Sequence, residues 1–198
     1  KPPVFLIYTT SLIVLIYGIW VLSKNMKILC TNCSESQKLS MNMPTLDILV
    51  AARDEQNVIA RLVERLFNLD YPSDKLKIYI IDDGSMDDTP IILKKLSKKY
   101  AKLNIISRSK NAGGGKSGAL NHALKFISGE WVFILDADAQ LKNDTLRRVL
   151  DFAQKGSWSA VQLRKSVLNT NKNFLTTCQG IEMAMDAYFQ VGRLYSAG

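Results

Sequence analysis

The sequence predicts an α/β protein with a mostly parallel sheet that is covered by helices on both faces. From Thr45 onward, short apolar runs alternate with longer amphipathic stretches, which is the pattern of strands and helices in βαβ units. The apolar runs are almost continuously hydrophobic, as in strands that are buried on both faces. At 198 residues the chain is long enough for one domain with its own core and a small addition.

The small addition is the N-terminal segment, where the run VFLIYTTSLIVLIYGIWVL, residues 4–22, contains no charge. As a helix this run could cross a hydrocarbon core of about 30 Å. A secretory signal peptide would have a shorter apolar region and a small-residue cleavage site, which the sequence does not display. We therefore predict a transmembrane anchor over residues 1–23, with a buried core helix as the alternative.

Basic residues follow the apolar run and dominate the charge of the chain. Lys24 and Lys27 come directly after the run, and the formal net charge is +8. Under the positive-inside rule they place the following domain in the cytoplasm, although Lys1 lies on the opposite flank. The basic balance also suits a domain that lies against anionic lipid. Nucleic-acid binding is not predicted, because no aromatic-basic motif accompanies the charge.

Residues 24–44 are polar, lack periodicity and end at a proline, which indicates a linker. Cys30 and Cys33 form one C-x-x-C pair within it. A zinc site would need two further ligands, and the chain offers only Cys178 and His122, both distant in sequence. The pair is therefore interpreted as an incidental feature of the linker.

The elements of the α/β domain follow in order after the linker. Strands are predicted at residues 45–52, 76–82, 103–108, 131–137 and 158–167. Helices are predicted at residues 57–69, 89–100, 116–127 and 143–154, and apolar residues recur at helical spacing over 173–195. Because βαβ crossovers are right-handed, the loops that leave the carboxyl ends of the strands gather at one edge of the sheet, where open α/β folds bind ligands.

Carboxylates follow two of these strands directly. The second strand ends in Asp82 and Asp83, and the fourth, WVFILDADAQ, ends in Asp136 and Asp138. Uncompensated charges at the end of a buried strand are costly to desolvate. A divalent cation such as Mg²⁺ or Mn²⁺, which takes carboxylate oxygens and substrate phosphates as ligands, would remove this cost. Helix-cap or turn roles are predicted instead for Asp87, Asp88 and Asp144.

The third strand is followed by a glycine-rich loop, NAGGGKSGALN. It is not a P-loop, because G-x-x-x-x-G-K-[ST] requires glycine where the chain has Lys110. Gly113, Gly115 and Gly118 have the dinucleotide-binding spacing, but they follow the third strand rather than the first. What remains is a backbone that can approach a phosphate closely and a helix start where Lys116 favours an anion.

Four segments together resemble the family 2 glycosyltransferases of the GT-A fold, a Rossmann-like α/β fold. They are LVAARDEQNVIARLVERL, IIDDGSMDDT, NAGGGKSGALNHAL and WVFILDADAQ, in the order and spacing of that family. The resemblance covers residues 45–198, which are expected to form the catalytic domain. It implies an inverting transfer of a sugar from a nucleotide diphosphate sugar, usually with Mg²⁺ or Mn²⁺.

The resemblance also implies how the nucleotide of the donor would be held. Asp83 of the DDG segment would bind the base, with Asp82 beside it. Glu55 of the first loop would help to shape the same pocket. This loop departs from the commoner family form at Arg53 and Asp54, where an aromatic residue and Asn are frequent.

The diphosphate and the metal would be held by the third and fourth loops. Lys116 would face the diphosphate, Asp136 would lie near the ribose and the metal, and Asp138 of the D-x-D motif would be the direct metal ligand. The general base of the family belongs to a later acidic motif, which is expected beyond Gly198. The chain is thus expected to contain the donor half of the site.

The acceptor is indicated by the last segment, residues 158–198. It is similar to the corresponding stretch of cyanobacterial-type β-monoglucosyldiacylglycerol synthases, membrane enzymes that transfer glucose from UDP-glucose to diacylglycerol. It is similar, more loosely, to cellulose, hyaluronan and poly-N-acetylglucosamine synthases. A lipid acceptor is the preferred interpretation. A processive polysaccharide synthase is the alternative, and a nucleotide-binding module without transferase activity is a third.

Overall fold

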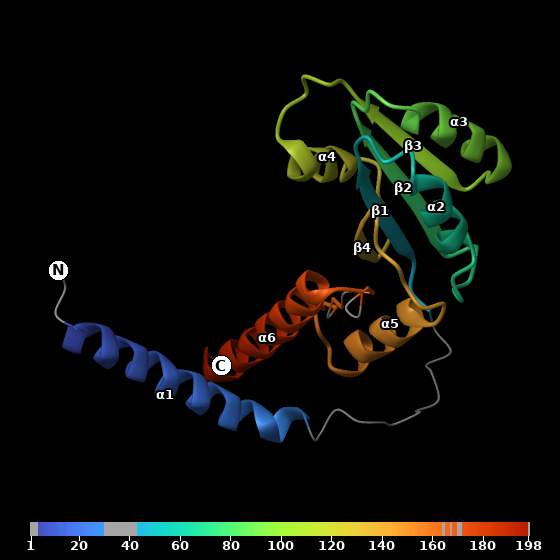
Figure 1. Ribbon diagram of the computed structural model, residues 1–198. Coiled ribbons are helices and arrows are strands. Elements are labelled where there is room, and N and C mark those ends of the chain that lie inside the picture. Colours follow the sequence, from blue (N-terminus) through green and yellow to red (C-terminus); the bar gives the residue numbers. More distant parts are fainter. Residues whose placement is uncertain (1–3, 30–42, 164, 167, 170–171, 198) are drawn as a thin grey trace. The chain divides into compact units, whose positions relative to one another are not determined.

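The centre of the fold is one parallel sheet with the strand order β3-β2-β1-β4 (Figure 1). The computed structural model describes residues 4–29, 43–163, 165–166, 168–169 and 172–197, with side chains described over 8–20 and over the parts of 43–186 within these ranges. The strands are β1 (Leu46–Ala52), β2 (Leu76–Asp83), β3 (Leu103–Arg108) and β4 (Trp131–Asp136). The predicted α/β fold with a parallel sheet is confirmed.

Right-handed crossovers explain which face each helix covers. The chain runs from β1 to β2 to β3 in one direction across the sheet and returns from β3 to β4 in the other. The helices of the first two crossovers therefore share a face, and the helix of the third lies on the opposite face (Figure 1). They are α2 (Ile59–Phe67), α3 (Thr89–Lys99) and α4 (Gly115–Ala123), and α5 (Thr145–Lys155) follows β4.

The larger core lies on the face that α2, α3 and α5 cover. The buried residues of α2 recur at the spacing of one helical stripe: Ile59, Leu62, Val63 and Leu66. They belong to the same cluster as strand side chains that are at most 1% exposed: Ile48, Val50, Ile78 and Ile80. Burial of each such side chain contributes about 1.5–3 kcal/mol, so this face dominates the stability of the sheet.

The smaller core lies beneath α4 on the other face. Ala119 and Ala123 of α4 are fully buried against Leu49, Tyr79 and Ile81 of β1 and β2. Alanine is small, so α4 can approach the sheet closely at these positions. This packing fixes the first turn of α4, and with it the glycine-rich loop, relative to the strand ends.

Two longer helices lie outside the sheet domain. α1 (Val4–Leu29) and α6 (Phe174–Ala197) contact each other and belong to one compact unit, distinct from the unit that contains the sheet. The helical spacing over 173–195 is thus confirmed as a helix.

Among the helices of the described chain, none has both the length and the apolar character needed to cross a membrane. The transmembrane anchor predicted over residues 1–23 is therefore not supported.

The segment predicted as a linker over residues 24–44 begins inside α1, which continues to Leu29. Residues 30–42, including Cys30 and Cys33, lie outside the described part of the chain. From Thr45 onward the strand of β1 begins within one residue of its predicted start.

The strand predicted over 158–167 is also wrong, because the described residues in this range form no strand. The Trp158 N–H donates to the Ala153 carbonyl at 2.9 Å, so the chain leaves α5 in a turn. Residues 159–161 then line a cavity of about 290 Å³ together with Trp131 and Phe133 of β4. The segment thus approaches β4 through side chains and not through a ladder of backbone hydrogen bonds.

Candidate functional site

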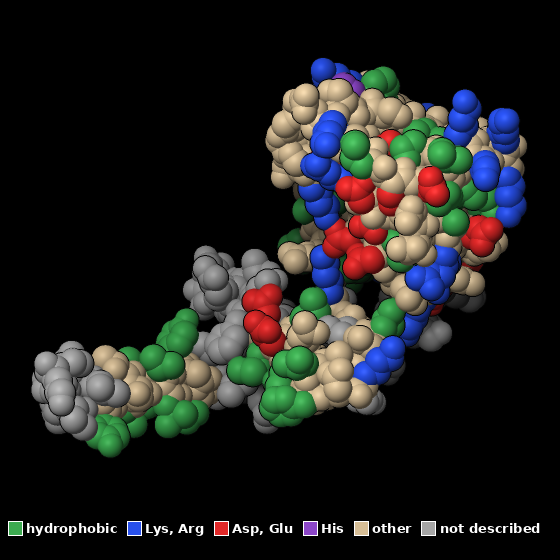
Figure 2. Space-filling view, turned by 45° about the horizontal axis from the view of Figure 1, so that its top comes forward, with side chains coloured by type: hydrophobic (Ala, Val, Ile, Leu, Met, Phe, Trp, Pro, Cys, Tyr) green, Lys and Arg blue, Asp and Glu red, His purple; other side chains and the backbone are tan. Residues whose placement is uncertain are grey.

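The carboxyl ends of the strands meet at one edge of the sheet because all strands are parallel. The register places Asp82 opposite Ala52, Asp83 opposite Arg108, and Asp136 opposite Ala51. The alanines at the end of β1 therefore lie between the two acidic strand ends and add little bulk there. Figure 2, with this end of the domain turned forward, shows acidic side chains gathered on it and basic side chains around them.

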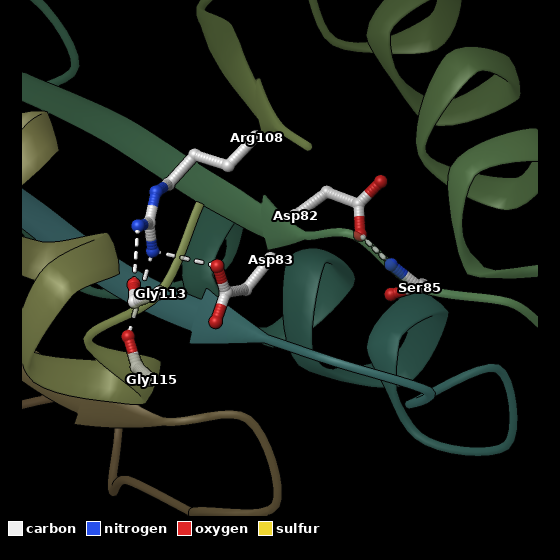
Figure 3. A network of polar contacts seen from close by, with 6 residues as sticks. All are labelled: Asp82, Asp83, Ser85, Arg108, Gly113 and Gly115. Carbon is white, nitrogen blue, oxygen red and sulfur yellow. Dashed lines mark hydrogen bonds and ion pairs between the residues drawn. The ribbon is translucent and has the colours of Figure 1, made fainter. Parts of the chain in front are cut away.

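Asp82 and Asp83 lie on opposite faces of the sheet, because successive strand residues alternate. The Asp82 carboxylate accepts the Ser85 N–H at 3.0 Å and so closes the turn after β2 (Figure 3). Asp83 points to the face that α4 covers, where it meets Arg108 (Figure 3). The structure thus separates the two carboxylates that the sequence places side by side.

The ion pair of Asp83 and Arg108 is the most buried one at this edge. Arg108 Nη1 lies 2.6 Å from Asp83 Oδ1, and the side chains are 7% and 11% exposed respectively. The Arg108 guanidinium also donates to the Gly113 carbonyl at 2.7 Å. Sequence reasoning missed Arg108, although an arginine at the end of the strand next to Asp83 was a signal that could have revealed it.

Lys116 lies in the first turn of α4, directly after the glycine-rich loop. Gly113, Gly114 and Gly115 all have positive φ, a conformation that side chains disfavour, and they turn the chain into the helix. From there Lys116 Nζ forms an ion pair with Asp136 Oδ1 at the end of β4. Asp83, Arg108, Lys116 and Asp136 are thus gathered on the α4 side of the strand ends.

Asp138 follows in a turn that the Ala139 N–H closes by donating to the Asp136 carbonyl at 3.1 Å. Its side chain is exposed. Within the described residues no group of three or more His, Cys, Asp or Glu could hold a metal ion by itself. Asp136 and Asp138 supply two carboxylates at the end of β4, a number that suits a cation that also takes ligands from a substrate.

Glu55 lies in the loop after β1, which hydrogen bonds extensively to the loop after β2. The Glu55 N–H donates to Thr89 Oγ1 at 2.9 Å. Asp54, with a positive φ of 57°, accepts the Met86 N–H at 2.6 Å and donates its own N–H to Ser85 Oγ at 3.0 Å. These bonds hold the first loop, with Glu55, against the second.

Asp87 is the carboxylate that joins the loop after β1 to the loop after β2. Its two oxygens accept the Thr89 N–H and the Gln56 N–H, each at 3.0 Å. Desolvation opposes its ionisation, but the hydrogen bonds from Thr89 and Gln56 outweigh it and hold the pKa of Asp87 below its ordinary value. Of the cap or turn roles predicted for three aspartates, Asp87 has the turn role. Asp88 and Asp144 occupy the N-cap positions of α3 and α5, but their side chains make no capping hydrogen bond.

The lowered pKa predicts how an Asp87→Asn variant responds to pH. A carboxylate whose pKa is depressed in the folded state stabilises the protein above its unfolded pKa of about 3.9, and this contribution is lost as pH falls through the folded value. We expect Asp87→Asn to lower the unfolding midpoint at pH 7 and to differ less from the wild type at about pH 3. Thermal unfolding at both values measures this, with Asp88→Asn as the matched control. An equal difference at both values would contradict it.

Gly84 of the DDG segment is expected not to tolerate a side chain. Its φ is +70°, and a Cβ there would lie 2.5 Å from Lys110 Cα, which is backbone that cannot rotate away. Gly84→Ala should therefore cost more than the roughly 1–2 kcal/mol of a left-handed conformation alone. Gly113→Ala is the control, since Gly113 has a φ of +68° but open space around it. Denaturant unfolding should show the larger loss for Gly84→Ala, and equal losses would refute the contact.

Comparison with known proteins decides the family. The family model described as Glycosyl transferase family 2 matches residues 47–190. The chain belongs to glycosyl transferase family 2. The resemblance drawn from the four sequence segments is thus confirmed.

Two curated members and one solved structure show how far the similarity extends. The beta-monoglucosyldiacylglycerol synthase of Synechocystis is 44% identical over 155 residues, which is 78% of this chain and 32% of that protein. The cellulose synthase catalytic subunit of Komagataeibacter sucrofermentans is 38% identical over 96 residues, 48% of this chain and 12% of that protein. The mannosyltransferase PcManGT of Pyrobaculum calidifontis, solved with GDP-Man and Mn²⁺, has a TM-score of 0.56 at 22% identity and covers 80% of this chain and 48% of its own.

These matches have different weight. The structural neighbour supports the GT-A type of fold and nothing finer at its level of identity. The synthases of cyanobacteria support a family 2 member related to glycolipid synthesis. The chain spans about a third of the length of these relatives.

Proposed function

We propose that the protein is an inverting glycosyltransferase that transfers glucose from UDP-glucose to a lipid acceptor such as diacylglycerol. The observation that carries this proposal is the gathering of Asp83, Lys116 and Asp136 at the strand ends, in a chain 44% identical to beta-monoglucosyldiacylglycerol synthases. Residues 45–198 would form the catalytic domain, and this part would bind the donor.

The nucleotide would lie across the ends of β2 and β3. Asp83 would accept an N–H of the base, because Arg108 occupies one of its carboxylate oxygens and leaves the other as an acceptor. Glu55 would border this pocket from the first loop, which hydrogen bonds hold against the loop after β2. Asp82 would support the base site indirectly, by closing the turn that follows it.

The diphosphate would lie between the start of α4 and the end of β4. The Lys116 ammonium, now paired with Asp136, would turn to the diphosphate and neutralise charge as the nucleoside diphosphate leaves. The backbone N–H groups at the start of α4 favour an anion in the same place.

Asp138 and Asp136 fit a divalent cation, Mg²⁺ or Mn²⁺. Such ions take oxygen ligands and are commonly bound by one or two carboxylates with substrate phosphates completing the shell. Bound there, the ion would supply Lewis-acid stabilisation of the leaving diphosphate. Asp138 is exposed in the turn after β4, where its carboxylate is accessible to a ligand.

The enzyme is proposed to act at the cytoplasmic surface of a membrane, where a lipid acceptor is found. Apolar side chains of α1 such as Leu12, Ile13 and Ile16 are 56–65% exposed and suit an apolar environment. The formal net charge of +8 suits anionic lipid.

A processive polysaccharide synthase is the second candidate, because part of the chain is 38% identical to a cellulose synthase subunit. A product assay separates the candidates. Membranes that contain the full-length protein receive radiolabelled UDP-glucose, Mg²⁺ and diacylglycerol, and the products are separated by thin-layer chromatography. Label that migrates as a monoglucosyl lipid is the expected result. Label retained at the origin as polymer would favour the synthase, and binding of UDP without any transfer would favour a non-catalytic module.

A further inference from the structure

We propose that Arg108 is a positioning residue that couples the two halves of the donor site. It would link the base-binding carboxylate of Asp83 to the glycine-rich loop that presents Lys116, so that base and diphosphate are bound as one unit. This inference rests on the proposed function, since it assumes that a nucleotide diphosphate occupies the site.

The guanidinium of Arg108 reaches both halves at once. Nη1 donates to Asp83 Oδ1 at 2.6 Å, and Nη2 donates to the Gly113 carbonyl at 2.7 Å (Figure 3). Nη1 also donates to the Gly115 carbonyl at 3.5 Å, in the residue directly before Lys116. Only a planar fork of donors can serve a carboxylate and two carbonyls in this way, whereas a lysine ammonium is a single compact charge.

Burial indicates that Arg108 acts through these neighbours and does not contact the donor itself. Its side chain is 7% exposed. Gly118 of α4 leaves the space that the guanidinium fills, because a Cβ there would lie 3.2 Å from Arg108 Nη2 and 2.7 Å from the Gly113 oxygen. The glycine at this position is thus explained by Arg108 and the carbonyl that it holds.

A second contact joins the same two loops. The Cα of Gly84, next to Asp83, is packed so closely on Lys110 that a Cβ would overlap the Lys110 backbone. The loop after β2 and the loop after β3 are therefore fixed to each other by backbone packing as well as by Arg108. A change at one of them is expected to be felt at the other.

The test compares ligands that occupy one half or both halves of the site. Uridine, pyrophosphate and UDP are titrated in Mg²⁺ against radiolabelled UDP on the full-length wild type and on Arg108→Lys. Coupling predicts that Arg108→Lys weakens uridine and pyrophosphate alike, each by about tenfold, the size of a lost charge-assisted hydrogen bond. Asp83→Asn keeps an oxygen that can accept from Arg108, so the link between the loops is retained. This variant should weaken uridine binding and leave pyrophosphate binding within about threefold.

Controls separate positioning from a loss of folding. Arg147→Lys makes the same chemical change in an ion pair with Asp70 at 3.2 Å and should leave all three affinities unchanged. If Arg108→Lys does not fold, Gly118→Ala replaces it, because the new methyl group would press on the Gly113 carbonyl and on Arg108 Nη2 and so disturb their contact while Arg108 keeps its charge. Gly118→Ala is likewise expected to weaken the binding of both uridine and pyrophosphate.

Each result bears on a different statement. Weakening of uridine alone, or of neither ligand, would overturn the coupling while the proposed function stands. A wild-type protein that does not bind UDP would overturn the proposed function, and this inference with it.

Discussion

Asp138→Asn is expected to lower the rate of sugar transfer by about 10²- to 10³-fold. The substitution keeps the size of the side chain and removes the charge that would hold a divalent cation against the leaving diphosphate. Loss of one group that stabilises charge in a transition state has an effect of this size. Asp138 is exposed in a turn, so the loss should come without a change in the unfolding midpoint.

The rate is measured by transfer of radiolabel from UDP-glucose, and metal binding by the electron paramagnetic resonance of Mn²⁺ in the presence of UDP. Asp144→Asn is the matched control, because it removes the same charge from an exposed carboxylate at the start of α5. Transfer by Asp138→Asn within tenfold of the wild type would rule out Asp138 as the metal ligand.

Asp83→Ala is expected to lower the free energy of unfolding by about 3 kcal/mol. Removal of one partner of a buried ion pair leaves an uncompensated charge, which typically costs about 3–5 kcal/mol. The lower end of this range is expected because Arg108 keeps its hydrogen bonds to the carbonyls of Gly113 and Gly115. UDP binding should be lost in the same variant, since Asp83 is the proposed acceptor for the base.

A double variant distinguishes the loss of the pair from other effects of the truncation. Arg108→Met removes the orphaned charge, so Asp83→Ala with Arg108→Met should be destabilised by less than the sum of the two single variants. Denaturant unfolding of the four proteins gives the coupling energy. Additive losses would mean that the 2.6 Å contact contributes nothing to stability.

The sheet could be predicted from sequence because parallel strands are buried on both faces. β1 and the middle of β2 are almost continuously apolar, and the predicted bounds of the two strands differ from the observed ones by one residue. The amphipathic segments between these strands predict the crossover helices. Connections of this kind between parallel strands are right-handed. In contrast, α4 ends at Ala123 and not at residue 127, because only its two alanines are buried and little packing favours a longer helix.

The prediction that failed concerns a segment whose packing partners are distant in sequence, and a second prediction is not supported. The run 158–167 is apolar enough for a strand, but the turn after α5 directs it elsewhere. The apolar run at the N-terminus is helical, as predicted, yet in the described chain it does not meet the requirements of a membrane span. Local composition is a weak guide to such segments because tertiary packing decides their state.

The sequence predicted which strand ends carry the candidate site, but not the hydrogen bonds and ion pairs between its side chains. The rule that ligands bind at the carboxyl ends of parallel strands correctly brought Asp83, Lys116 and Asp136 together. Arg108 escaped notice because its role depends on the strand order, which places β3 beside β2. Asp82 and Asp83 could have been separated by the alternation of strand residues, since adjacent side chains point to opposite faces.

The proposal that these loops bind a nucleotide sugar is tested most directly by calorimetric titration of UDP into the full-length protein, once with Mg²⁺ or Mn²⁺ and once with EDTA. We predict saturable binding of one UDP per chain that weakens at least tenfold in EDTA and is lost in Asp83→Ala. Absence of UDP binding in the presence of the cation would contradict the assignment of the strand-end loops as a donor site.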